Sequence, residues 1–406
     1  MSYKFVEGGV CAPKGFTAGG VHAGIRKNPE KKDLALIFAD RECAAAAVYT
    51  KNKVKGAPLK VTAAHLENGR ARAVLCNSGN ANTCNADGIY IAEEMCKSAA
   101  EILNIDENDI IIASTGVIGQ PLPIEPVKAS MGALKESLSL KGSPDAASAI
   151  MTTDTKLKEA AISFELQGKA CFIGGIAKGS GMIHPNMATM LCFVTTDVAI
   201  SPELLKEACR ETADDTFNMI SVDGDTSTND MFTIMASGEA GNTLIEERGE
   251  DYDMFKEALF ALCRKLSKEL AADGEGATKL LECTVKGAPD KATAGKIAKS
   301  VVCSNLLKAA MFGKDANWGR ILCAIGYTDG DFDISKAGVS IASSAGRITV
   351  CRDGAGVPFS EEEALKILSE NEILIEADLC QGEGEATAWG CDLTYDYVRI
   401  NGDYRT

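Results

Sequence analysis

The sequence predicts an α/β protein, and two kinds of segment support that prediction. The first kind is a strand-like run whose alternating side chains are mostly apolar on both faces, and residues 190–195 are the clearest example. A strand of this kind is expected to be covered on both sides. The second kind is a helix-like run with a single apolar stripe, which is clearest over residues 255–270.

Other segments extend this pattern along the chain. Further strands are expected at residues 34–38, 45–49, 71–76, 109–113, 160–166, 171–177 and 373–379. Further helices are expected at residues 91–102 and 124–138, after the N-cap Ser201 with Pro202 at its first position, and at a capping box of Ser360 with Glu363. Residues 1–70 contain many glycines and are expected to form short strands and turns.

The composition is that of an ordinary globular chain. With 406 residues, 46% hydrophobic and 24% charged, it can form two layered domains or one large one. The net charge of −15 argues against nucleic acid and anionic membranes as partners. No apolar stretch is long enough to span a bilayer, and the N-terminus does not resemble a signal peptide. We therefore expect a cytoplasmic protein.

Cysteine and histidine usage narrows the chemistry. The fifteen cysteines are odd in number and scattered, so reduced core thiols are expected, for example at Cys76, Cys192, Cys263 and Cys323. Three histidines are too few for a histidine-rich metal site, and His184 is expected to make a structural hydrogen bond. The acidic run at residues 221–230 lacks the pattern of an EF-hand, so no metal is expected.

One threonine stands where a self-processing nucleophile would lie. Thr189 is at the head of the buried strand, behind the loop Lys-Gly-Ser-Gly-Met-Ile-His-Pro-Asn-Met-Ala that begins at Lys178. If the bond between Ala188 and Thr189 breaks, Thr189 has both a hydroxyl and a free α-amine. An amine with a pKa of roughly 7.7–8.0 can accept the hydroxyl proton without a histidine. Taken alone, this stretch favours an ordinary strand that follows a Gly/Pro turn.

Three further segments could form a site. The strand at residues 109–113 opens into Thr115 and Gly116, which offer backbone N–H groups and a hydroxyl, as an oxyanion requires; an ordinary turn fits as well. The asparagine-rich run at residues 77–82 suits a loop that binds its own backbone, or the wall of a site. Glu275 lies between two glycines, a setting that is usually a solvated turn.

The Thr189 segment and these three are among at least seven separate segments that, in the same order, resemble the ornithine acetyltransferase family, also called glutamate N-acetyltransferases. The resemblance runs from the glycine-rich start to the last threonine, with departures at residues 83–86 and at Ala316, where the family usually has proline. It implies a four-layer α/β/β/α fold with an N-terminal-nucleophile-like active site. It also implies self-cleavage into chains 1–188 and 189–406 that remain intertwined in one folded unit, as a heterotetramer of two of each.

The resemblance also assigns residues to roles. It implies cleavage between Ala188 and Thr189, with Thr189 as the nucleophile. The remaining implied site residues are the oxyanion pair Thr115 and Gly116, the active-site Glu275, and the substrate-binding Thr152, Lys178, Asn401 and Thr406. Glu275 is a candidate proton shuttle. Lys178 could keep the α-amine neutral or bind a substrate carboxylate, and the sequence leaves both roles open.

The activity implied is acetyl transfer from N2-acetyl-L-ornithine to L-glutamate in arginine biosynthesis. No cofactor is expected, and acetyl-CoA stays open as a second donor substrate. One alternative is a hydrolase on the same self-cleaving scaffold, such as an aminopeptidase or amidohydrolase. Another is a non-catalytic protein that binds amino acids.

Overall fold

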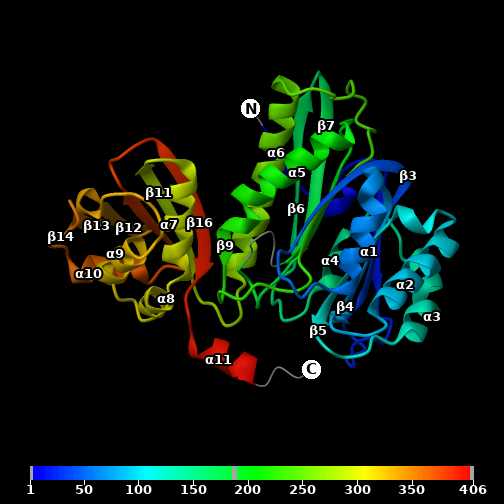
Figure 1. Ribbon diagram of the computed structural model, residues 1–406, viewed down its shortest axis with the longest axis horizontal. Coiled ribbons are helices and arrows are strands. Elements are labelled where there is room, and N and C mark those ends of the chain that lie inside the picture. The colour runs from blue at the N-terminus through cyan, green and yellow to red at the C-terminus, as the bar shows by residue number, and fades with distance from the viewer. Residues whose placement is uncertain (1–2, 185–189, 403–406) are drawn as a thin grey trace.

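Two mixed β-sheets with helices packed against them make up the protein (Figure 1). The computed structural model describes residues 3–184 and 190–402, and all statements of structure below refer to these residues. Over them the first sheet has nine strands and the second has seven. The α/β class and the helices that flank the two sheets confirm the predicted fold class.

The first sheet has the strand order β1-β6-β7-β8-β10-β3-β4-β5, and β2 also pairs with β3. Its strands are β1 (Tyr3–Val6), β2 (Phe16–Val21), β3 (Leu34–Tyr49), β4 (Arg70–Asn80), β5 (Ile110–Val117), β6 (Lys158–Leu166), β7 (Lys169–Lys178), β8 (Leu191–Thr196) and β10 (Met231–Ala236). Strand β8 pairs with β7 on one side and with β10 on the other. Strands from before and after the predicted cleavage point therefore share one sheet.

Helices cover both faces of the first sheet. Helices α5 (Pro202–Asp215) and α6 (Glu250–Ala272) pack on one face, where Cys192 and Val194 join their core. Helix α4 (Ser143–Ile150) shares a core with Leu191 and Phe193 on the other face. All six residues of β8 are buried, as the two-sided apolar pattern predicts. Helices α1 (Ala57–His65), α2 (Gly88–Leu103) and α3 (Ile124–Glu136) pack near β4 and β5.

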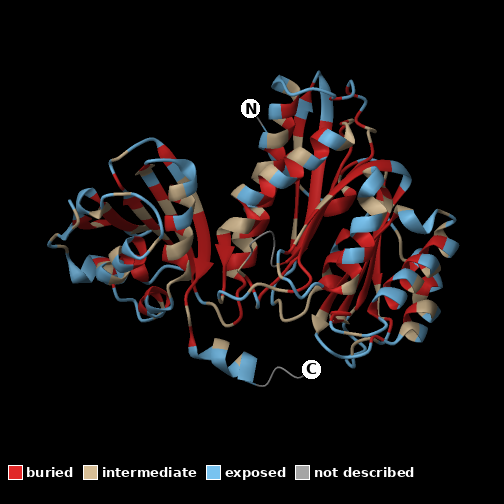
Figure 2. Ribbon diagram, viewed as in Figure 1, coloured by how far each residue is buried: buried red, intermediate tan, exposed pale blue. Residues whose placement is uncertain are grey.

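The second sheet has the order β14-β13-β12-β15-β11-β16-β9. Its strands are β9 (Ile220–Ser221), β11 (Leu280–Ala288), β12 (Gly338–Ser343), β13 (Gly346–Arg352), β14 (Ala355–Gly356), β15 (Glu372–Asp378) and β16 (Gly384–Cys391). Its helices are α7 (Lys291–Cys303), α8 (Asn305–Phe312), α9 (Trp318–Gly326) and α10 (Glu361–Leu368). Leu280, Trp389 and Cys391 share a core with α6, which links the two sheets. Figure 2 shows that the strands of both sheets are largely buried.

After β16 the chain forms α11 (Tyr395–Gly402), which extends below the sheets in Figure 1. Short 3₁₀ turns complete the secondary structure at Gly9–Cys11, Leu66–Asn68, Glu107–Asp109, Phe217–Met219 and Ile334–Lys336. No helix among residues 3–184 and 190–402 is long and apolar enough to cross a membrane.

The structure corrects the sequence-based prediction at several points. The two strands expected at residues 34–38 and 45–49 are one long strand, β3, whose pairing with β4 shifts between Phe38 and Cys43. The asparagine-rich run, expected as a loop, continues β4 as far as Asn80 because β5 pairs with it. Residues 1–70 contain the helix α1, which was not expected. All fifteen cysteines are free, but Cys323 is exposed rather than in the core.

Candidate active site

A cavity of about 130 Å³ lies where β5 and β7 end and β8 begins. Its walls include all six of the predicted site residues that the structure describes, namely Thr115, Gly116, Thr152, Lys178, Glu275 and Asn401. The other predicted residues, Ala188, Thr189 and Thr406, lie outside the described residues. Met190, which follows Thr189 in the chain, also lines the cavity.

The oxyanion pair predicted from the sequence lies at the end of β5. Gly116 has a φ of 135°, and a Cβ atom there would collide with the backbone of Gly79 in β4. Only glycine can adopt this conformation without that collision. Glycine therefore allows the backbone of β5 to turn toward the cavity. Beside it, Thr115 is 9% exposed, and its Oγ1 lies 3.2 Å from Nζ of Lys178.

Lys178 is the last residue of β7 and its side chain is almost fully buried. Burial lowers the pKa of its ammonium group. The carboxylates of Asp154 and Asp230 oppose this effect, whereas the ammonium group of Lys158 adds to it. A buried ammonium beside a hydroxyl at a cavity wall can stabilise negative charge that develops there.

Glu275 is buried rather than solvated, contrary to the usual setting of a Gly-Glu-Gly turn. Its backbone N–H donates to the carbonyl of Ser180 at 2.9 Å, which joins two walls of the cavity. Its Oε2 accepts a hydrogen bond of 2.7 Å from Nδ2 of Asn401 on α11. A Cβ atom at Gly181 would collide with this carboxylate, so that glycine makes room for it.

Sequence reasoning missed Asn229, whose side chain connects the end of β5 beside Thr115 to other residues near the cavity. Its Nδ2 donates to the carbonyls of Ala81 and Ser114, at 2.6 and 2.9 Å, and its Oδ1 accepts from Thr83 and Thr228. All four hydrogen bonds of this buried amide are satisfied, so it fixes the backbone next to Thr115. The signal was its place in a polar run, Ser-Thr-Asn-Asp, directly before the strand β10.

His184 behaves as the structural histidine that the sequence suggested. Its Nδ1 lies 3.1 Å from Oγ of Ser221 and 3.5 Å from Sγ of Cys303, and it does not line the cavity as the described residues define it. Burial lowers the pKa of the imidazole to about 4, and the nearby Lys299 adds to the effect. The ring is therefore neutral at physiological pH.

Together the fold and the cavity define an α/β protein with a pocket lined largely by polar residues. The sequence profile of the ArgJ family matches residues 17–406. Relatives include the "Arginine biosynthesis bifunctional protein ArgJ" of Symbiobacterium thermophilum, 52% identical over 99% of this chain and 100% of that protein. Those of Caldanaerobacter subterraneus subsp. tengcongensis and Bacillus subtilis are 49% and 46% identical, each over 99% of this chain and over 100% and 97% of their own lengths. The chain belongs to the ArgJ family.

A solved structure agrees with this assignment. The crystal structure of arginine biosynthesis bifunctional protein ArgJ from Bacillus halodurans is 46% identical, with a TM-score of 0.50. The match covers 52% of this chain but 98% of the chain in that structure. The matched chain is therefore about half as long as this one.

Proposed function

We propose that this chain transfers an acetyl group from N2-acetyl-L-ornithine to L-glutamate, which gives L-ornithine and N-acetyl-L-glutamate for arginine biosynthesis. The observation that carries this proposal is the meeting of the six described site residues at one cavity in a chain of the ArgJ family. The small volume of the cavity suits amino-acid substrates.

The nucleophile proposed is Thr189, set free by self-cleavage. Its hydroxyl would attack the carbonyl carbon of Ala188, and the peptide nitrogen would leave as the α-amine of Thr189. Water would then hydrolyse the resulting ester. Two observations support this step. The matched chain from Bacillus halodurans is about half as long as this one, and β8 is held between β7 and β10, so two fragments would stay together.

In the first half-reaction, the α-amine of Thr189 accepts the hydroxyl proton as the oxygen attacks the acetyl carbonyl. The negative charge that forms on the carbonyl oxygen is stabilised by the Thr115 hydroxyl and the Gly116 N–H. The bond between the acetyl carbon and the ornithine nitrogen then breaks, and ornithine takes up a proton as it leaves. We assign this proton transfer to Glu275, whose buried carboxylate lines the cavity.

In the second half-reaction, the amine of glutamate attacks the acetyl ester, and the Thr189 oxygen leaves with a proton. Both substrates share an α-carboxylate and an α-nitrogen, so fixed groups can bind both. We assign this role to Lys178, Thr152 and Asn401, which line the cavity, and to the C-terminal Thr406. Catalysis by these side chains requires no cofactor.

We further propose acetyl-CoA as a second acetyl donor, supported by the word "bifunctional" in the names of the relatives.

The fifteen free cysteines support a reducing compartment, and we propose that the enzyme is cytoplasmic. The proposed assembly is a heterotetramer of two fragments 1–188 and two fragments 189–406. Size-exclusion chromatography with mass detection tests this stoichiometry.

The test of the activity is a direct assay. Purified protein is incubated with N2-acetyl-L-ornithine and L-glutamate, and N-acetyl-L-glutamate and acetate are measured. The transferase proposal expects N-acetyl-L-glutamate, with Thr189→Ala inactive. Acetate without N-acetyl-L-glutamate would instead identify an amidohydrolase. Mass spectrometry of the same sample should find a fragment that begins at Thr189, and a fully active protein of 42.7 kDa would exclude self-cleavage.

A further inference from the structure

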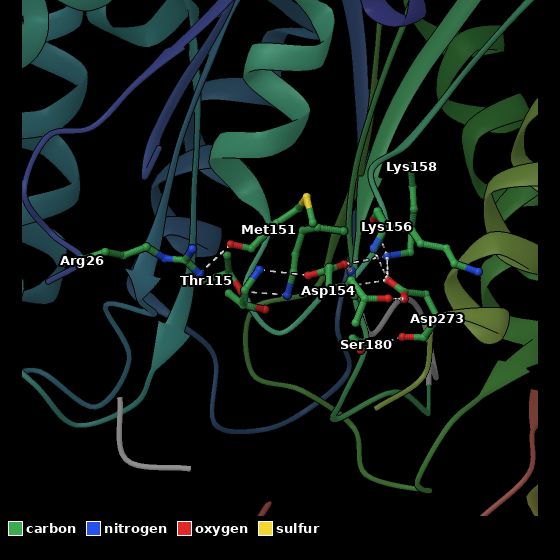
Figure 3. Close-up of polar contacts among 12 residues, drawn as sticks. Arg26, Thr115, Met151, Asp154, Lys156, Lys158, Ser180 and Asp273 are labelled. Atoms are coloured by element: carbon green, nitrogen blue, oxygen red, sulfur yellow. Dashed lines mark hydrogen bonds and ion pairs between the residues drawn. The ribbon is translucent and has the colours of Figure 1, made fainter. Parts of the chain in front are cut away.

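Three charged side chains are buried together behind the wall of the cavity: Asp154, Lys158 and Asp273, here called the buried triad. Nζ of Lys158 lies 2.8 Å from Oδ1 of Asp154 and 2.6 Å from Oδ2 of Asp273 (Figure 3). Their side chains are 0%, 1% and 3% exposed, in that order along the chain. Burial of an ion pair is weak support for stability in itself, because removing each charge from water has a large energetic cost. The proposed mechanism uses none of the three.

Asp154 fixes the backbone of two cavity walls. Its Oδ2 accepts a hydrogen bond of 2.9 Å from the N–H of Thr152, a cavity residue. Its Oδ1 accepts one of 2.7 Å from the N–H of Gly179, the residue that follows Lys178. One carboxylate therefore determines the spacing between two proposed substrate-binding residues.

Asp273 connects the cavity wall that contains Glu275 to the two walls that contain Thr152 and Lys178. Its Oδ2 accepts the N–H groups of Thr155 and Lys156 at 3.0 and 3.2 Å, and Thr155 also donates its hydroxyl to Oδ1. The carbonyl of Asp273 accepts a hydrogen bond of 2.6 Å from Oγ of Ser180. Two residues further on is Glu275, whose N–H is bonded to the carbonyl of Ser180.

The buried ammonium of Lys178 is opposite in sign to the net charge of the buried triad. Two carboxylates and one ammonium give the buried triad a net charge of −1, and the ammonium of Lys178 offsets it. Charged or titratable groups that face Lys178 are Asp154, Lys158, Asp230 and Cys76. Burial would raise the pKa of Asp154, but Lys178 and Lys158 hold that pKa well below its usual range, which keeps the carboxylate ionised.

We propose that the members of the buried triad are positioning residues: they align the three walls of the cavity and supply the counter-charge that the buried ammonium of Lys178 requires beside Thr115. None of the three lines the cavity among the residues that the structure describes. The inference rests on the proposed function, in which Lys178 and Thr115 act on the substrate.

The test measures the titration of Lys178 without any acetyl transfer. Cyanate carbamoylates only the neutral form of an amine, so its rate at Lys178, followed by peptide mass spectrometry over a pH series, gives the midpoint of the ammonium group. Asp154→Asn removes the negative charge and should move this midpoint to lower pH by roughly one unit or more. Lys158→Met removes a positive charge and should move it to higher pH. Lys60, which is exposed on α1, is the internal reference.

The opposite directions separate a charge role from a merely structural one. The basic limb of the profile of kcat/KM against pH should move with the midpoint in each variant. Lys158→Arg keeps the charge but not the two short contacts, so it should leave the midpoint in place and raise KM. If Lys158→Met does not fold, the midpoint of Lys178 in Asp154→Asn is the deciding measurement, because this substitution preserves the shape of the side chain. Unmoved midpoints, or shifts in the same direction, overturn the inference. If the midpoints move but the parent protein transfers no acetyl group, the proposed function is wrong, whereas the proposed role of the buried triad is supported.

Discussion

Lys178 donates a hydrogen bond from Nζ to Oγ1 of Thr115, 63 positions earlier in the chain. An ammonium group has donors only, so Thr115 accepts here and its own O–H is free to point into the cavity. A charged donor also polarises the hydroxyl, which makes it a better donor to a third group. The pair is therefore suited to stabilise an oxyanion at the cavity wall.

The first prediction concerns the hydroxyl of Thr115. Thr115→Ala should lower kcat/KM by on the order of 10²-fold or more, because one oxyanion donor is lost. Thr115→Ser keeps the hydroxyl and should retain most of the activity. Both variants should melt within a few degrees of the parent protein. A Thr115→Ala variant with normal rates would remove Thr115 from the mechanism.

The second prediction separates backbone strain from steric collision at Gly116. Gly116→Ala should destabilise the protein by about 3 kcal/mol or more, for two reasons. The φ of 135° at position 116 strains a residue that has a side chain, and the new Cβ atom would collide with the backbone of Gly79. Gly119 is a matched control, since it has a φ of 74° but open space where a Cβ would lie. Gly119→Ala should cost only about 1 kcal/mol. Equal losses in urea unfolding would show that the contact with β4 is unimportant.

Much of the secondary structure could be predicted because it follows local patterns. The two-sided apolar run predicted at residues 190–195 is β8, and the predicted stripe at 255–270 lies within α6. The run from Asn77 to Asn80 could not be predicted in the same way, since asparagine and glycine favour turns locally. Its pairing with β3 and β5 overrides that preference.

The site shows the same division between local and distant information. Resemblance identified Glu275 and Asn401, but their contact joins residues 126 positions apart, which no local pattern contains. The buried triad was missed because Asp154 and Lys158 stand in a polar run that reads as solvated surface. Only the fold brings Asp273, 115 positions from Lys158, to the same place.

The third prediction tests the contact between α11 and Glu275. Asn401→Ala removes a hydrogen bond to a charged group and should lower kcat/KM by about tenfold. Asn401→Asp sets two carboxylates against each other and should lower it further. Val398, 70% exposed on the same helix, gives the control variant Val398→Ala, which should behave as the parent protein. Unchanged kinetics in both Asn401 variants would mean that α11 plays no part in catalysis.

The fourth prediction uses the pKa of His184, which burial lowers to about 4 from an ordinary value near 6.5. As the pH falls below about 6.5, His184 takes up a proton in the unfolded chain, whereas in the folded chain it stays neutral until about pH 4. The stability that the neutral ring contributes is thus present above pH 6.5 and is lost as the pH falls toward 4. Between pH 6.5 and 4, the His184→Asn variant should lose less stability than the parent protein, and the difference between the two losses should be roughly 1–3 kcal/mol.

Urea unfolding at pH 7 and pH 4.5 measures this difference. If the proposed self-cleavage occurs, a Thr189→Ala background should keep the chain in one piece and so allow a single unfolding transition to be analysed. The comparison is between the two pH-dependent losses, since carboxylates contribute equally to both proteins. Identical losses would show that His184 titrates normally in the folded chain.

The last prediction is the kinetic order of the reaction. In the proposed mechanism one nucleophile serves both half-reactions, so the acetyl group is expected to reside on Thr189 between donor and acceptor. Ornithine should therefore leave before glutamate attacks, which gives parallel lines in double-reciprocal plots. Processed enzyme incubated with N2-acetyl-L-ornithine alone should gain one acetyl group on the fragment that begins at Thr189, and added glutamate should remove it. Thr115→Ala should form this adduct more slowly, because the oxyanion of the first half-reaction is less well stabilised. Intersecting lines without an acetylated fragment would mean direct transfer between two bound substrates, and Thr189 would then need a role other than that of the acetyl carrier.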